Sequence, residues 1–207
     1  MAVVITVAQQ KGGAGKTMLA ASLASALAAT RRVALLDIDP QRSLAHWHRL
    51  RGGQAVPAIS LSDVSGWRLP AELDRLRAGH DVLIVDSPPQ IDTDARVAVR
   101  AADLVLVPLQ PSPPDLWAAE GTLRLAAEER RPARLLLNRA PASGRLRAGV
   151  EAAIAEAGHP VLVSVLGNRI GFAGAFARGL GISETAPTSL AGREMAALLA
   201  EIEGVLR

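Results

Sequence analysis

Short apolar runs rich in β-branched residues alternate along this chain with longer segments whose apolar positions recur at helical spacing. The runs show no polar alternation, which is typical of strands covered on both faces. Strands that alternate with helices favour a parallel sheet joined by crossover helices. The predicted strands are Val3–Ala8, Val33–Asp37, Val82–Asp86, Leu104–Pro108, Arg134–Asn138 and Val161–Leu166, with a weaker run at Ala58–Leu61. The expected fold class is α/β, a mostly parallel twisted sheet with helices on both faces.

The helical segments lie between these runs. They are Lys16–Ala29, Leu44–Arg51, Pro70–Ala78, Asp94–Ala101, Leu116–Glu129, Leu146–Ala157 and Ser189–Leu206. The glycine-rich region 168–182 predicts no single element. The chain shows no linker, low-complexity tract or internal repeat, so residues 1–207 are expected to form one domain. In an open α/β sheet, ligands bind at the carboxyl ends of the strands, and several distinctive motifs fall there.

Composition excludes several classes of protein. The chain has 207 residues, 49% of them hydrophobic, and no cysteine, which rules out a thiolate zinc site, an iron–sulfur cluster and a disulfide framework. The first residues read as a strand and not as a signal peptide. No apolar run reaches the ~18–20 residues that a membrane span needs. We therefore expect a cytoplasmic protein.

The basic residues are unevenly divided between arginine and lysine. The net charge is +3, and 21 of the 23 basic residues are arginine. Arginine keeps its charge to high pH, which explains a sequence pI of 10.4. The only two lysines, Lys11 and Lys16, lie in one seven-residue motif. Their retention indicates that the motif needs a compact ammonium group.

That motif follows a predicted strand and opens a predicted helix. Its glycines let backbone N–H groups turn inward around phosphate oxygens, and the helix start adds its positive dipole end. The predicted nucleotide contacts are Lys11, Gly12, Gly13, Ala14, Gly15, Lys16, Thr17 and Met18. Lys16 is expected to reach the β- and γ-phosphates of ATP, and the Thr17 hydroxyl to bind Mg²⁺.

Two predicted strands end in aspartate, at Asp37 and at Asp86. A carboxylate at the end of a buried strand is costly unless it faces a cation or water. Asp86 is therefore predicted to hold Mg²⁺ directly or through water. Asp37 is predicted to lie near the metal and Thr17. The alternative for both is an aspartate that caps the next helix.

The loop departs from the usual phosphate-binding pattern, because Gln10 stands where glycine is expected and Lys11 precedes the double glycine. The form K-G-G-x-G-K-T resembles the deviant Walker A loop of the ParA/MinD family of P-loop ATPases. The resemblance implies one P-loop ATPase domain over residues 1–207, a homodimer that sandwiches ATP, and a Lys11 that reaches the partner's nucleotide. Asp37-Ile-Asp39-Pro40-Gln41 resembles the family's second signature, in which Asp39 helps to position the attacking water. Lys11, Lys16 and Asp39 are thus the expected catalytic residues.

Two further segments extend the resemblance. It implies that Asn138 reads the adenine edge, with Arg139 beside it; a plain turn asparagine is the alternative. Leu104–Asp115 resembles the proline-rich segment of small ParF-type partition ATPases, which places Pro111 beside the nucleotide and the dimer interface. The alternative there is an ordinary loop that starts a helix at Asp115.

The first and last segments indicate which members of the family this chain resembles. No amino-terminal helix-turn-helix fits before the first strand. The final helical pattern carries glutamates as well as arginines, a poor match to the basic membrane helix of MinD proteins, so it is expected to pack on the domain and no membrane partner is expected. The resemblance implies non-specific DNA binding, with Arg169 and Arg193 as the candidate contacts. The alternative is scattered surface arginines.

The resemblance implies a slow ATPase that binds DNA as an ATP dimer on the nucleoid. A ParB-like or other adaptor would stimulate hydrolysis and release it. Plasmid or chromosome partition is the leading hypothesis for the cargo. A protein cargo such as a carboxysome or chemoreceptor cluster, a MinD-like membrane regulator and an enzyme of dethiobiotin-synthetase type are the alternatives.

Overall fold

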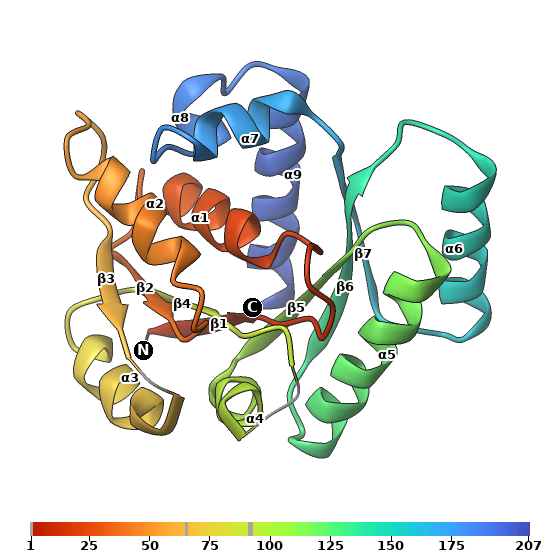
Figure 1. Cartoon of the computed structure of the whole chain (residues 1–207), viewed down its shortest axis with the longest axis horizontal. Helices are drawn as coiled ribbons and strands as arrows, with labels where there is room; N and C mark the ends of the chain where they lie inside the picture. The colour runs from red at the N-terminus through yellow and green to blue at the C-terminus, as the bar shows by residue number, and fades with distance from the viewer. Residues whose placement is uncertain (1, 65, 91–92) are drawn as a thin grey trace.

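The computed structural model describes residues 2–64, 66–90 and 93–207. Its strands form a seven-stranded sheet in the order β3-β2-β4-β1-β5-β6-β7, and every recorded pairing is parallel (Figure 1). The strands are β1 (Val3–Val7), β2 (Val33–Asp37), β3 (Ser60–Asp63), β4 (Val82–Asp86), β5 (Leu104–Leu109), β6 (Ala133–Ala140) and β7 (Val161–Gly167). The predicted fold class is confirmed.

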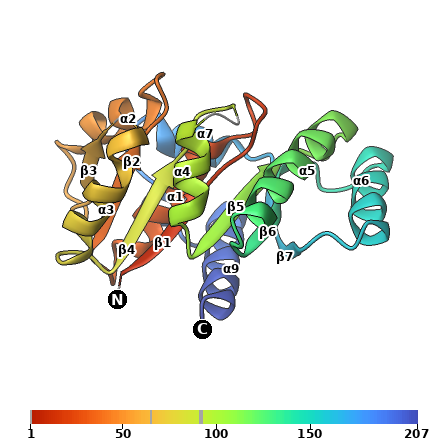
Figure 2. The same cartoon turned by 90° about the horizontal axis from the view of Figure 1, so that it is seen from below.

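The helices cover both faces of the sheet, as Figures 1 and 2 show from two directions. One face carries α1 (Lys16–Leu27), α2 (Ser43–Arg51), α7 (Ile170–Phe176), α8 (Ile182–Thr185) and α9 (Leu190–Val205). The other carries α3 (Leu69–Arg77), α4 (Thr93–Ala101), α5 (Pro113–Glu128) and α6 (Arg145–Glu156). Successive residues of a strand point to opposite faces, so Ile5 packs under α1 while Val4 packs under α3 and α4. Because both faces of such strands are covered by helices, their sequences need not alternate between polar and apolar residues.

Three segments differ from the sequence prediction. The helix expected from Leu116 begins at Pro113, because proline fits the first turn of a helix, where its missing N–H is not needed. The region 168–182 holds the two short helices α7 and α8. The weak strand lies at Ser60–Asp63, shifted toward the carboxyl end.

The sequence predicts that every strand is covered on both faces, and for β7 this prediction is wrong. It lies at the sheet edge, and its Val163 is 91% exposed. The helix α9 covers this edge: Glu201 accepts hydrogen bonds from the backbone N–H groups of Val163 (2.7 Å) and Ser164 (2.8 Å), and Glu194 from that of Gly167 (3.0 Å). The glutamates of the last helix are thus used within the fold, and its predicted role in packing on the domain is confirmed.

The register of the sheet brings the predicted site together. Asp37 of β2 lies beside Asp86 of β4, and Val7 of β1 lies on the other side of Asp86. The glycine-rich loop follows β1, so it leaves the sheet next to both aspartates. Within the described part of the chain, no helix is both long and apolar enough to cross a membrane.

Candidate nucleotide site

The glycine-rich loop has the backbone conformation of a phosphate-binding turn. Gly13 (φ 84°) and Gly15 (φ 89°) both lie in the left-handed region, which side chains rarely tolerate. Gly15 directly precedes α1 and offers no side chain to cap it. The first N–H groups of α1 therefore remain available to an anion.

Lys16 lies at the base of this loop. Its side chain is buried, and the ammonium donates to the Gln9 carbonyl at 3.1 Å. Burial lowers the pKa of Lys16, while the carboxylates of Asp86 and Asp39 oppose the shift. The loop thus keeps its cation between backbone oxygens and acidic side chains, where a phosphate chain would meet it.

Asp86 is the most unusual carboxylate of the site. It is fully buried, and among the described residues neither of its oxygens has a hydrogen-bond partner of ordinary geometry. Burial raises its pKa to about 7; the Thr17 hydroxyl opposes the shift, the Asp37 carboxylate adds to it, and the Lys16 ammonium opposes it. Two unsatisfied carboxylate oxygens are hard ligands that suit Mg²⁺. The residues present therefore fit this cation.

Unlike Asp86, Asp37 has a hydrogen-bond partner for each of its carboxylate oxygens. One of its oxygens accepts from the N–H of Asp39 at 3.2 Å and the other from that of Ala45, in the first turn of α2, at 2.9 Å. Burial raises its pKa, and these two hydrogen bonds oppose the shift. The helix-capping alternative therefore describes its contacts, while each oxygen keeps a lone pair for a more distant cation or water. Its predicted place near the metal stays a prediction.

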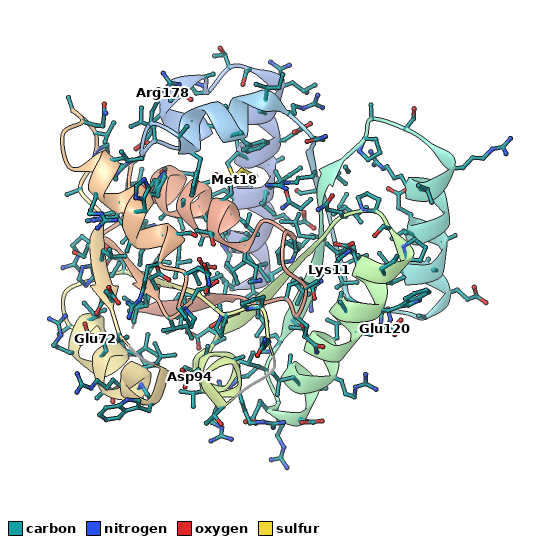
Figure 3. The ribbon with its side chains drawn as sticks, viewed as in Figure 1. Lys11, Met18, Glu72, Asp94, Glu120 and Arg178 are labelled. Carbon is teal, nitrogen blue, oxygen red and sulfur yellow. The ribbon has the colours of Figure 1, made fainter. Side chains whose placement is uncertain are left out.

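A pocket of about 470 Å³ opens above the loop, between α1, the segment after β2, and α7. Asp39 is half-buried at its wall and accepts from the Gln41 N–H at 2.9 Å. Met18, labelled in Figure 3 between α1 and α7, also contributes. The pocket is lined by Gly12, Gly13, Gly15, Lys16, Thr17, Met18, Asp39, Gln41, Ser43, Pro89, Arg139, Ala173, Phe176 and Ala177.

Among the described residues, no group of three acidic or histidine side chains forms a ready-made cation site. The site offers Mg²⁺ the free oxygens of Asp86 and the Thr17 hydroxyl nearby. Mg²⁺ usually takes one or two protein ligands together with substrate phosphates and water. The arrangement matches a metal that arrives with a nucleotide.

The side chain of Lys11 points toward the start of α5 (Figure 3). Its ammonium is bound to the Asp115 carboxylate, which also accepts from the Ser112 hydroxyl at 2.6 Å. The Lys11 side chain is 42% exposed and that of Asp115 only 3%. The sequence predicts Asp115 only as the start of a helix. The spacing Ser112-x-x-Asp115, which resembles a helix-capping pattern, is the signal for a carboxylate held at this point.

Two glutamines bind the loop to α5. Gln9 donates to the carbonyls of Pro108 (3.3 Å) and Asp115 (3.4 Å). Gln10 packs against Gly121, where an added Cβ would come within 2.0 Å of its amide nitrogen. The amide of Gln10, the residue that departs from the usual motif, therefore fills the space beside Gly121. Sequence reasoning found neither contact, because nothing local in the chain links residues so far apart.

Asn138 supports the loop from its other side. Its amide donates to the Ala14 carbonyl at 2.8 Å and accepts from the Arg139 N–H at 3.0 Å. An added Cβ on Gly15 would come within 2.6 Å of the same amide. Arg139 lies at the pocket wall with φ of 51°. Asn138 is buried against the loop, so its expected contact with adenine remains a prediction.

The remaining predicted residues lie outside the pocket. Pro111 is buried at the start of the loop that leads into α5. Arg169 donates from Nε (2.9 Å) and Nη2 (2.6 Å) to Glu194, and Arg193 donates to the Thr188 carbonyl at 2.5 Å. Both candidate DNA contacts are thus held by their own chain.

Comparison with known proteins also indicates a nucleotide-binding domain. The CobQ/CobB/MinD/ParA nucleotide binding domain family matches residues 5–182. The maintenance of carboxysome distribution protein A of Halothiobacillus neapolitanus is 28% identical over 86% of this chain and 85% of its own length. The chromosome partitioning protein ParA of Myxococcus xanthus is 33% identical over 59% of this chain and 56% of its own. A variant of McdA from Cyanothece, solved in complex with ATP, superposes with a TM-score of 0.83 at 20% identity, covering 98% of this chain and 96% of the other.

Proposed function

This chain belongs to the CobQ/CobB/MinD/ParA nucleotide-binding family, and on that premise we propose that residues 1–207 act as one ParA-like ATPase domain. The meeting of Lys16, Thr17 and Asp86 at one end of the sheet carries the proposal. The loop N–H groups and Lys16 bind the phosphates of ATP. Asp86 and Thr17 hold Mg²⁺, with Asp37 behind them. Held by these residues, Mg²⁺ would neutralise negative charge on the phosphates.

Hydrolysis of ATP needs few groups beyond those that position the phosphate and the attacking water. Asp39 lies at the pocket wall with one oxygen held by the Gln41 N–H. It orients the attacking water, while Lys16 neutralises the charge that develops on the phosphate oxygens. Few groups contribute, so turnover is slow until a partner protein stimulates it.

A second subunit completes the site. Lys11 lies at the mouth of the loop with a large part of its side chain in solvent. An ammonium in this place reaches the phosphates of a nucleotide held by a facing copy of the chain. ATP then holds two subunits together, and Pro111 and Arg139 lie beside that interface.

The ATP dimer binds DNA without sequence preference and carries a cargo through the nucleoid. Plasmid or chromosome partition through a ParB-like adaptor is the first candidate, supported by the partitioning relative. A protein cargo is the second, and the relative named for carboxysome distribution, matched over most of its length, favours it. A shell component encoded beside this chain would identify the second.

DNA binding measured in ATP, in ADP and without nucleotide tests the proposal, with wild type and Lys11→Ala compared. We expect binding only in ATP, abolished by Lys11→Ala and unchanged by Arg75→Ala, which removes a surface cation from α3. Equal DNA binding in all three states contradicts the proposal. ATP-dependent sedimentation with liposomes would instead favour a membrane regulator.

A further inference from the structure

The arginines of this chain divide into paired and unpaired groups. Within the described residues, ten of the 21 arginines form ion pairs with acidic side chains. Of the others, Arg124, Arg130, Arg131 and Arg134 lie close together in the sequence, at the end of α5 and the start of β6. Four of the eleven arginines without an ion pair among the described residues are therefore grouped within eleven positions of the sequence.

Three of these arginines line a groove of about 530 Å³ between α5, the start of β6 and the residues that precede β7, which we call the basic groove. Arg124, Arg131 and Arg134 line it, together with His159 and Glu120. Figure 3 shows Glu120 on the side of α5 that faces α6. Among the described residues, Arg131 Nε and His159 Nε2 are buried without a hydrogen-bond partner. These two nitrogens are shielded from solvent, so the positive charge that an anion would meet in the groove comes from the three arginines.

Nearby acids do not neutralise the basic groove. Of the described residues that line it, Glu120 is the one acid, and its carboxylate stands 3.6 Å from His159 Nε2. Glu128, the last residue of α5, and Glu129, which follows it, are bound by Arg96 and Arg100 of α4. The charge of the groove arginines is therefore left for a ligand from solution.

We propose that the basic groove binds the phosphate backbone of DNA, an inference that rests on the proposed function. Guanidinium groups match phosphate oxygens in charge and geometry, and backbone contacts carry no sequence information. The lining residues include no aromatic anchor of the kind that holds a protein segment. DNA therefore fits the groove better than an acidic partner protein does.

The position of the basic groove explains how ATP could control DNA binding. Asp115, which contacts Lys11, lies in the first turn of α5, and the helix ends beside the groove, at the opposite end of the strands (Figure 1). Nucleotide, second subunit and DNA can thus be bound together. An ATP dimer carries two grooves, and binding through both raises the affinity for one duplex without any change of shape.

Two double variants with the same change of charge test this inference. Fluorescence anisotropy of a labelled random duplex is measured in ATP across a salt series for wild type, Arg124→Gln/Arg134→Gln and Arg169→Gln/Arg193→Gln. We expect the affinity of the groove variant to fall about tenfold or more, and its salt slope to fall by about 0.9 for each phosphate that the protein no longer neutralises. The second pair should stay within about twofold of wild type, since both arginines are engaged by their own chain. ATP turnover without DNA reports that each variant is folded.

Several outcomes would overturn the inference. If wild type binds DNA and the groove variant binds it equally well, DNA lies elsewhere and the proposed function stands. Loss of binding only in Arg169→Gln/Arg193→Gln returns the contact to those residues. Groove-dependent binding of labelled poly-glutamate, without binding of DNA, assigns the groove to an acidic protein. Wild-type protein that binds no DNA in ATP refutes the proposed function itself.

Discussion

The Lys11 ammonium is bound to the carboxylate of Asp115 in its own chain, although the proposed partner of Lys11 is a phosphate of another subunit. The Asp115 side chain is buried, and among the described residues its second oxygen has no hydrogen-bond partner. A buried carboxylate that loses its cation becomes costly. Asp115 therefore competes with the second subunit for Lys11.

Asp115→Asn should lower the ATP concentration at which the chain dimerises. The amide keeps the size of the side chain and removes the charge that holds Lys11. Because Lys11 is partly exposed, we expect a change of about two- to fivefold. Analytical ultracentrifugation across an ATP series measures it, and an unchanged or higher threshold contradicts the competition.

Asp39→Ala should retain ATP and hydrolyse it about 100-fold more slowly, since the water loses the carboxylate that orients it. Nucleotide binding and phosphate release are measured separately. Asp74→Ala, at an exposed position on α3, serves as the control and should leave both unchanged. Turnover that survives in Asp39→Ala removes this residue from the mechanism.

Gly121→Ala should weaken ATP binding, although Gly121 does not line the pocket. The added methyl forces the flexible Gln10 side chain, which directly precedes the phosphate loop, to leave its place beside α5, at a cost of about 1 kcal/mol in stability. Gly149→Ala in α6 is the matched control. An added Cβ there meets nothing within 4 Å, so the change should stabilise the helix by about 0.5–1 kcal/mol. Calorimetry and nucleotide titration of both variants measure the contrast.

Glu184→Gln should destabilise the fold by about 3 kcal/mol. Glu184 is bound at 2.6 and 2.9 Å by Arg51, whose side chain is 4% exposed and lies over the Trp47 ring. Removing one member leaves a buried charge without its partner. Glu203→Gln breaks an exposed pair with Arg31 and should cost less than about 0.5 kcal/mol. Equal losses of unfolding free energy in urea would contradict this account.

Acid should weaken the contact between α4 and α5. Hydrogen bonds from Arg100 and Arg96 lower the pKa of Glu129 to about 2. A carboxyl group whose pKa is lowered by folding stabilises the native state above its unfolded pKa, and the contribution is lost as the pH falls toward 2. Glu129→Gln should flatten the dependence of melting temperature on pH between about 4.5 and 2. A slope equal to that of wild type would remove this contact from the acid response.

Patterns within single segments of the sequence were enough to predict many of the strands and the phosphate loop. The strands that end at Asp37 and Asp86 are apolar and bounded by turn residues, and the glycines of the phosphate loop stand where the backbone needs a positive φ. A chain segment reports its own backbone preferences, so such features can be read directly.

Contacts between distant segments could not be read in this way. Gln10 against Gly121, Lys11 against Asp115 and Asn138 against Ala14 each join residues about 100 or more positions apart. The edge position of β7 follows from the strand order, which its own sequence does not encode. These relations depend on how the strands are arranged, and the arrangement is a property of the whole chain.

The two glutamates of α9 that bind the backbone of β7 also restrict pairing between this edge of the sheet and another molecule. The N–H groups of Val163, Ser164 and Gly167 are taken by Glu201 and Glu194, so they are not free to pair with a strand of another molecule. An open edge is the usual starting point for fibres and amyloid. Copies of this chain at high concentration are thereby kept from joining sheet to sheet along β7.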